Sequence, residues 1–62
     1  MTQSPDDRFR QLRHDLSNPL SAILAETQLL LLRADTLDQE TVTSLKEIEA
    51  LSRRMREILQ KN

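Results

Sequence analysis

The sequence predicts an all-α protein, an antiparallel hairpin of two helices. The chain has 62 residues with no glycine and a single aromatic residue, and it is rich in Leu, Ala, Glu, Gln, Arg and Lys, which favour helix. Its apolar residues recur at helical spacing in two segments, and a short polar segment separates them. We therefore expect residues 1–62 to form one helical domain.

The first helix is expected over residues 5–33. Ser4 offers a capping hydroxyl, Pro5 suits the first helical position, and Asp6 and Asp7 complement the positive end of the helix dipole. Beyond them a seam with spacings of four and three is typical of a helix in a bundle. The seam consists of Phe9, Arg13, Leu16, Leu20, Ile23, Thr27 and Leu30, with Leu12, Leu24 and Leu31 beside it.

Residues 34–38 interrupt this periodicity and are expected to form a loop, followed by a second helix over residues 39–60. Thr36, in a capping box with Gln39, and Asp38 are equally suited to cap that helix. So short a connection makes the two helices antiparallel. The second seam consists of Thr41, Leu45, Ile48, Ser52, Met55 and Leu59, widened by Leu51 and Ile58.

Two helices cannot cover each other's apolar stripes, and a chain of this length buries only about 60% of the surface that it exposes when unfolded. We therefore expect a homodimer that forms a four-helix bundle. The polar seam residues Thr27, Thr41 and Ser52 are expected to set the register of this packing or to bond to helix carbonyls.

Composition argues against several classes of partner. Charged residues make up 31% of the chain with both signs mixed and a net charge of −1, so nucleic acid and anionic membranes are not expected partners. The longest apolar run, residues 29–32, is far shorter than the ~20 residues that span a bilayer, so no membrane contact is expected. The absence of cysteine excludes disulfides and thiolate metal sites and fits a cytoplasmic protein.

One outward-facing group on the first helix stands out. At 100° per residue, His14 and Asn18 lie roughly 140° and 180° from the seam, one above the other. Pro19 follows them inside the helix, where a proline costs about 3 kcal/mol and kinks the chain. Because the apolar seam continues in phase on both sides of Pro19, the kink is mid-helix beside His14, and local strain next to a reactive side chain indicates function.

Residues 14–20, His-Asp-Leu-Ser-Asn-Pro-Leu, resemble the H-box of sensor histidine kinases, within their dimerisation and histidine-phosphotransfer domain. The resemblance rests on a histidine with an acid directly after it, Thr or Asn four residues on, proline five on and leucine six on. The two-helix arrangement resembles that domain over nearly the whole chain. Ser17 departs from the pattern, because the family often has a basic residue there.

The resemblance implies that His14 accepts the γ-phosphoryl group of ATP and donates it to an aspartate of a response-regulator receiver domain. Asp15 would hold or deprotonate the imidazole, Asn18 would orient a water during dephosphorylation of the regulator, and Pro19 would let the helix bend between states. ATP and Mg²⁺ would be bound by a separate catalytic domain, so no cofactor is expected in this chain. Because the sequence stops after the second helix, it is not expected to phosphorylate itself unaided.

The outward face continues below His14 as an uncharged strip, and small residues there let a partner helix approach closely. We expect a receiver-domain helix to dock on it. The leucines of the strip are equally suited to being covered by dimer packing. The strip consists of Ser21, Ala22, Ala25, Leu29 and Leu32.

Two other functions remain open. The chain is alternatively a purely structural dimerisation hairpin whose H-box is inert because it has no kinase partner. Independently of this, Asp15 is equally suited to being a solvated acid, and Asn18 is alternatively an ordinary surface residue. A third reading is a monomeric phosphotransfer protein, although such proteins usually close four helices within one chain.

Overall fold

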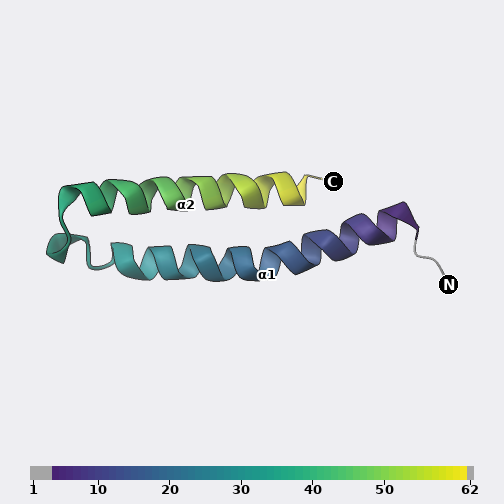
Figure 1. Ribbon diagram of the computed structural model, residues 1–62, viewed down its shortest axis with the longest axis horizontal. Helices are drawn as coiled ribbons and strands as arrows, with labels where there is room; N and C mark the ends of the chain where they lie inside the picture. Colours follow the sequence, from purple (N-terminus) through teal and green to yellow (C-terminus); the bar gives the residue numbers. More distant parts are fainter. Residues whose placement is uncertain (1–3, 62) are drawn as a thin grey trace.

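The computed structural model describes residues 4–61, and these form two long helices joined by one short 3-10 turn. Helix α1 spans Pro5–Leu31, the 3-10 turn η1 spans Ala34–Thr36, and α2 spans Gln39–Gln60. The helices lie antiparallel and side by side, with η1 at one end and the start of α1 and the end of α2 at the other (Figure 1). The described part of the chain is thus the predicted all-α hairpin; residues 1–3 and 62 of the predicted domain lie outside it.

Helix α1 begins as the sequence predicts. Ser4 has an extended backbone, and its Oγ accepts a hydrogen bond from the Asp7 N–H at 3.2 Å. Its carbonyl accepts from the Arg8 N–H at 3.1 Å, and Pro5 occupies the first helical position. These bonds satisfy N–H groups that lack partners within the helix.

Helix α1 ends at Leu31, two residues earlier than expected. No glycine is present to form a left-handed cap, so the last turn tightens instead, and the Arg33 N–H donates to the Leu30 carbonyl at 3.0 Å. The Thr36 N–H and hydroxyl both donate to the Arg33 carbonyl, at 2.9 and 2.7 Å. The expected loop over residues 34–38 therefore contains a turn of 3-10 helix.

Asp38, and not Thr36, caps α2. Its Oδ1 accepts a hydrogen bond from the Thr41 N–H at 2.9 Å, whereas the Thr36 hydroxyl is already bonded to the Arg33 carbonyl. Hydrogen bonding from Thr41, through its side chain and then its backbone, holds the pKa of Asp38 below its usual value.

The hairpin core is thin. Among the described residues only Leu20, Leu24 and Val42 are buried apolar side chains, with Thr27 and Ser52 buried beside them. The Thr27 hydroxyl donates to the Ile23 carbonyl at 2.7 Å, as expected for a polar residue within a seam.

The seam predicted on each helix is in fact two adjacent stripes. One stripe of α1, which includes Leu20, Leu24 and Thr27, packs against α2, and the other remains in solvent. The spacing of apolar residues alone did not separate the two stripes, because intervals of three and four residues occur in both. We call the solvent-exposed stripe, which occurs on both helices, the open apolar face. It consists of Phe9, Leu12, Leu16, Ile23 and Leu30 on α1 and of Ile48, Leu51, Met55 and Ile58 on α2, all between 42% and 65% exposed.

The first turns of α1 project beyond the last turn of α2 (Figure 1), because α1 has 27 residues and α2 has 22. The part of α1 nearest the N-terminus is also inclined relative to the rest of the helix. None of the described helices is long and apolar enough to cross a membrane.

Candidate functional site

His14 lies in the third turn of α1, on the side away from the open apolar face. Its side chain is 71% exposed, and Asn18, one turn further along the same side, is exposed as well. The imidazole is therefore outside the hairpin core, where the helical wheel predicts it.

Asp15 contacts the ring of His14. Its Oδ1 lies 3.6 Å from His14 Nδ1 and also accepts a hydrogen bond from Gln11 Nε2 at 3.0 Å. The distance to the ring is too long for a hydrogen bond but short enough for electrostatic attraction once the ring gains charge. Consecutive helix positions diverge by about 100°, so side-chain rotation brings the two groups together.

Gln11 is a residue that sequence reasoning missed. It holds the Asp15 carboxylate on the side of the helix that carries His14, and its spacing of four residues from Asp15 was the available signal. With Nδ1 turned toward Asp15, Nε2 is the ring nitrogen left for a reaction partner.

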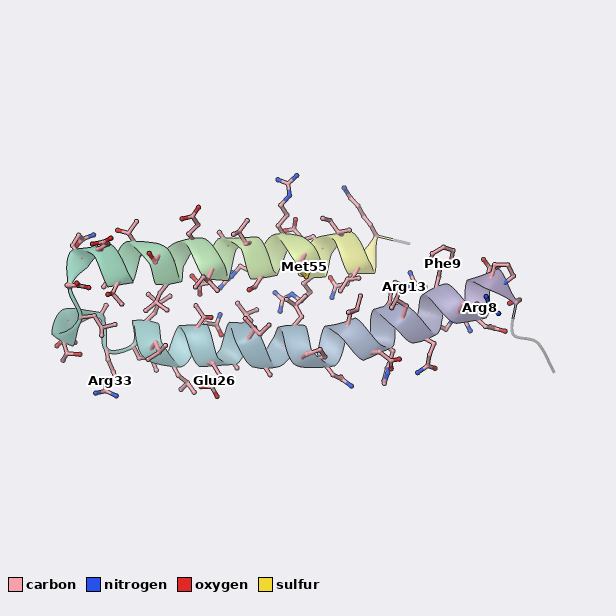
Figure 2. All side chains as sticks on the ribbon, in the orientation of Figure 1. Arg8, Phe9, Arg13, Glu26, Arg33 and Met55 are labelled. Atoms are coloured by element: carbon pink, nitrogen blue, oxygen red, sulfur yellow. The ribbon has the colours of Figure 1, made fainter. Side chains whose placement is uncertain are left out.

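Pro19 lies within the continuous run of α1, and its surroundings were not foreseen. It is roughly 140° from His14 around the helix and therefore lies on the other side. There it lines an apolar groove between the helices, toward which the Met55 side chain points from α2 (Figure 2). The remaining lining residues are Leu16, Leu20, Ile23, Ile48, Leu51 and Ser52. The proline thus borders the open apolar face and lies away from His14.

The residues of the predicted docking strip are all exposed, and they follow His14 along the outer side of α1. Leu29 and Leu32 are 57% and 80% exposed, so α2 does not cover them. Charged side chains lie near the strip: Glu26 of α1 and Arg33, just beyond the end of α1, both project away from α2 (Figure 2).

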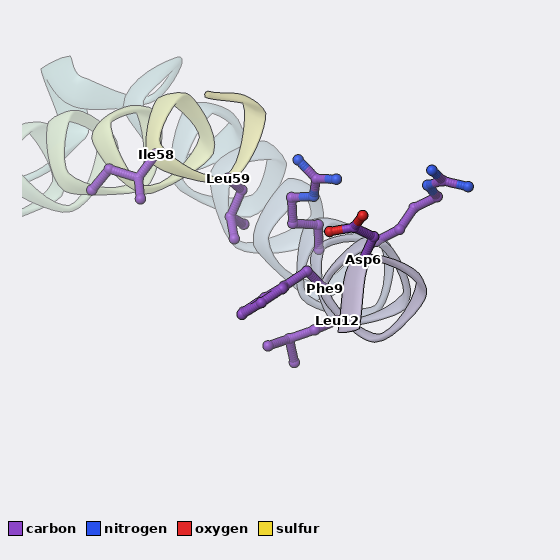
Figure 3. A pocket seen from close by; sticks show the side chains of 7 residues that line it. Asp6, Phe9, Leu12, Ile58 and Leu59 are labelled. Carbon is purple, nitrogen blue, oxygen red and sulfur yellow. The ribbon is translucent and has the colours of Figure 1, made fainter. Parts of the chain in front are cut away.

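A hollow at the open end of the hairpin was also not foreseen. Phe9 and Leu12 of α1 face Ile58 and Leu59 at the end of α2 (Figure 3). Asp6, Arg10 and Arg13 place charges at its edge. The hollow continues the open apolar face to the level of His14.

Fold and site together define a helical hairpin with one exposed, acid-paired histidine on its first helix. A family model described as His Kinase A (phospho-acceptor) domain matches residues 6–61, which include both helices and His14. The chain therefore belongs to the His Kinase A phospho-acceptor domain family, and this membership supports a phosphoacceptor and dimerisation role in a histidine kinase. Comparisons with curated proteins and with solved structures gave no significant match.

Proposed function

We propose that His14 accepts a phosphoryl group from ATP bound to a separate histidine-kinase catalytic domain and passes it to an aspartate of a receiver domain. One observation carries this proposal: in a chain of a phospho-acceptor family, His14 is exposed and has Nδ1 3.6 Å from Asp15. In the neutral tautomer with the proton on Nδ1, the ring presents the Nε2 lone pair to an incoming phosphoryl group.

In the first transfer, Nε2 attacks the γ-phosphorus of ATP. The nitrogen–phosphorus bond forms as the bond to the β,γ-bridging oxygen breaks, and ADP leaves with that electron pair. The ring gains positive charge, which Asp15 stabilises through Nδ1–H or removes by accepting the proton.

In the second transfer, a carboxylate oxygen of the receiver attacks phosphorus, and the nitrogen–phosphorus bond breaks. The electron pair of that bond returns to Nε2, and Nδ1 keeps its proton or takes it back from Asp15, so the neutral imidazole is restored. When the receiver is dephosphorylated, Asn18 orients the attacking water, since its amide lies one turn from His14 on the same side of α1. Bending of α1 near Pro19 switches the domain between these activities.

The working form is a homodimer in which the open apolar faces of two copies meet in a four-helix bundle. Nine large apolar side chains on this face are exposed in the single hairpin. Burying a fully exposed side chain of this kind contributes about 1.5–3 kcal/mol, and each of these nine, already partly covered, contributes a fraction of that when the dimer forms.

The receiver domain docks on the outer strip of α1, directly below His14. Its small residues, Ser21, Ala22 and Ala25, allow close approach, and Leu29 supplies apolar area. This strip and the open apolar face lie on different sides of α1, so receiver and dimer partner do not compete. We place this exchange in the cytoplasm.

The test is to incubate the chain with ATP, Mg²⁺ and the catalytic domain of a His Kinase A-type histidine kinase. We expect acid-labile phosphate on the wild type and none on His14→Gln. If several catalytic domains fail to label even the wild type, although it still dimerises, the result would favour a purely structural hairpin. A solution mass equal to one chain would instead favour a monomeric relay protein.

A further inference from the structure

Arg10 lies beside His14 on the surface of α1. A shallow hollow open to solvent is lined by Asp7, Arg10, Gln11 and His14, and all four residues belong to α1. Arg10 precedes His14 by one helical turn, so their side chains project from neighbouring positions of one side of the helix. The histidine therefore borders a cation on its N-terminal side and the Asn18 amide on the other.

Side chains on a helix lean toward its N-terminus, so a group attached to His14 covers the preceding turn, which contains Arg10 and Gln11. The hollow beside the imidazole is lined by these residues and not by Asn18. Because Nδ1 faces Asp15, a phosphoryl group on Nε2 extends away from that carboxylate.

Arg10 is held only loosely in the unphosphorylated chain. Its Nη1 lies 3.9 Å from Asp7 Oδ1, and the two side chains are 75% and 52% exposed. An exposed ion pair at this distance contributes little, so a stronger anion displaces the carboxylate readily. A phosphoryl group carries more charge than a carboxylate and accepts two parallel hydrogen bonds from a guanidinium.

We propose that Arg10 binds the phosphoryl group carried by His14, exchanging the carboxylate of Asp7 for phosphoryl oxygens. The inference rests on the proposed function, because it concerns the phosphorylated state of His14. Arg10 neutralises charge on the group while it waits for a receiver, and Asp7 keeps the guanidinium beside the site when His14 is unmodified.

The chain contains a matched control. Arg8 is another arginine of α1, but it lies roughly 160° around the helix from Arg10. It lines a different hollow, with Pro5, Phe9 and Leu12. Removing either arginine changes the net charge equally, and only one of them borders His14.

The experiment uses phosphoramidate, a small phosphoryl donor that modifies histidine without a kinase, so its result is independent of labelling by catalytic domains. His14 is the one histidine of the chain, and its phosphoryl group gives one ³¹P NMR signal to titrate with pH. We expect Arg10→Gln to raise the pKa of the phosphoryl group by on the order of half a unit, the size of one charge interaction across solvent.

Arg8→Gln should leave that pKa unchanged, Arg10→Lys should restore most of the wild-type value, and Asp7→Asn should lower it. Circular dichroism of each variant establishes that the helices are retained. The inference would be overturned if the phosphoryl group had the same pKa in the wild type and in Arg10→Gln. It would also be overturned if Arg10→Gln and Arg8→Gln shifted that pKa equally, because this would indicate a general effect of net charge.

Discussion

Oδ1 of Asp15 lies 3.6 Å from Nδ1 of His14, although the two residues are consecutive on a helix and their positions diverge. Gln11 Nε2 holds the same oxygen at 3.0 Å. This arrangement turns Nδ1 toward the carboxylate and leaves Nε2 facing away from it, where it can meet phosphorus. The chemistry proposed for this domain depends on that choice of nitrogen.

Asp15→Asn should slow phosphorylation of His14 by about 100-fold, because an amide stabilises the developing imidazolium poorly and accepts no proton. The measurement is the initial rate of labelling by a catalytic domain with ATP. Gln11→Ala should slow the same reaction only a few-fold, since it removes the hydrogen bond to the Asp15 carboxylate but leaves the carboxylate in place. An unchanged rate in Asp15→Asn would make that residue an ordinary solvated acid.

Asn18→Ala should leave phosphorylation of His14 close to the wild-type rate but slow the dephosphorylation of a receiver by about tenfold or more, since a positioning contact is lost. The check is the decay of phosphorylated receiver with and without the hairpin. Equal decay with wild type and variant would remove Asn18 from the proposed mechanism.

Ala25→Arg should slow transfer from phosphorylated His14 to a receiver by about tenfold, because a long charged side chain keeps the docking helix away. The dimer should persist, since this position is on the outer strip. Rapid mixing of phosphorylated hairpin with receiver measures the rate. If transfer is unaffected, the receiver docks elsewhere.

The sequence predicted the hairpin well because its signals are local. Ser4 and Pro5 mark the start of α1, and the polar segment after residue 33 marks the turn. The cap of α2 was left open between Thr36 and Asp38, since both fit the pattern. The structure chooses Asp38 because the tightened end of α1 presents the Arg33 carbonyl to the Thr36 hydroxyl.

The site was predictable where one helix determines it and unpredictable where two helices meet. The outward position of His14 follows from the wheel alone. The groove around Pro19 involves residues of α2 such as Met55, and the division of the seam into a buried stripe and an exposed one depends on how the helices are rotated against each other. Spacing within one helix contains no information about that rotation.

The cap of α2 should give the hairpin an acid-dependent stability. Because the pKa of Asp38 is lowered in the folded state, its contribution is present above the unfolded value of 3.8 and is lost as the pH falls through the folded value. Thermal unfolding of Asp38→Asn, which retains a capping oxygen, should lose this part of the pH dependence. If the Tm of the wild type and of the variant fell equally as the pH was lowered, the Asp38 cap would not be the source of this pH dependence.

The open apolar face and the outer strip offer a matched pair of leucines. Leu51 and Leu29 are 58% and 57% exposed in the hairpin, but only Leu51 lies on the face assigned to the dimer. Leu51→Glu should raise the dimer dissociation constant at least about 100-fold, from lost burial and a desolvated charge in both copies. Leu29→Glu should leave the dissociation constant close to that of the wild type. Sedimentation equilibrium measures the constant for both variants. Equal effects would place the dimer interface elsewhere.

The most direct test of the account is the intact mass of the chain after reaction with ATP and a catalytic domain, taken before and after a receiver is added. We expect one phosphoryl group per wild-type chain, none on His14→Gln, and transfer of the group from the chain to the receiver. A phosphoryl group that remains on His14→Gln, or a wild-type chain that never acquires one, would contradict the assignment of His14 as the phosphoacceptor.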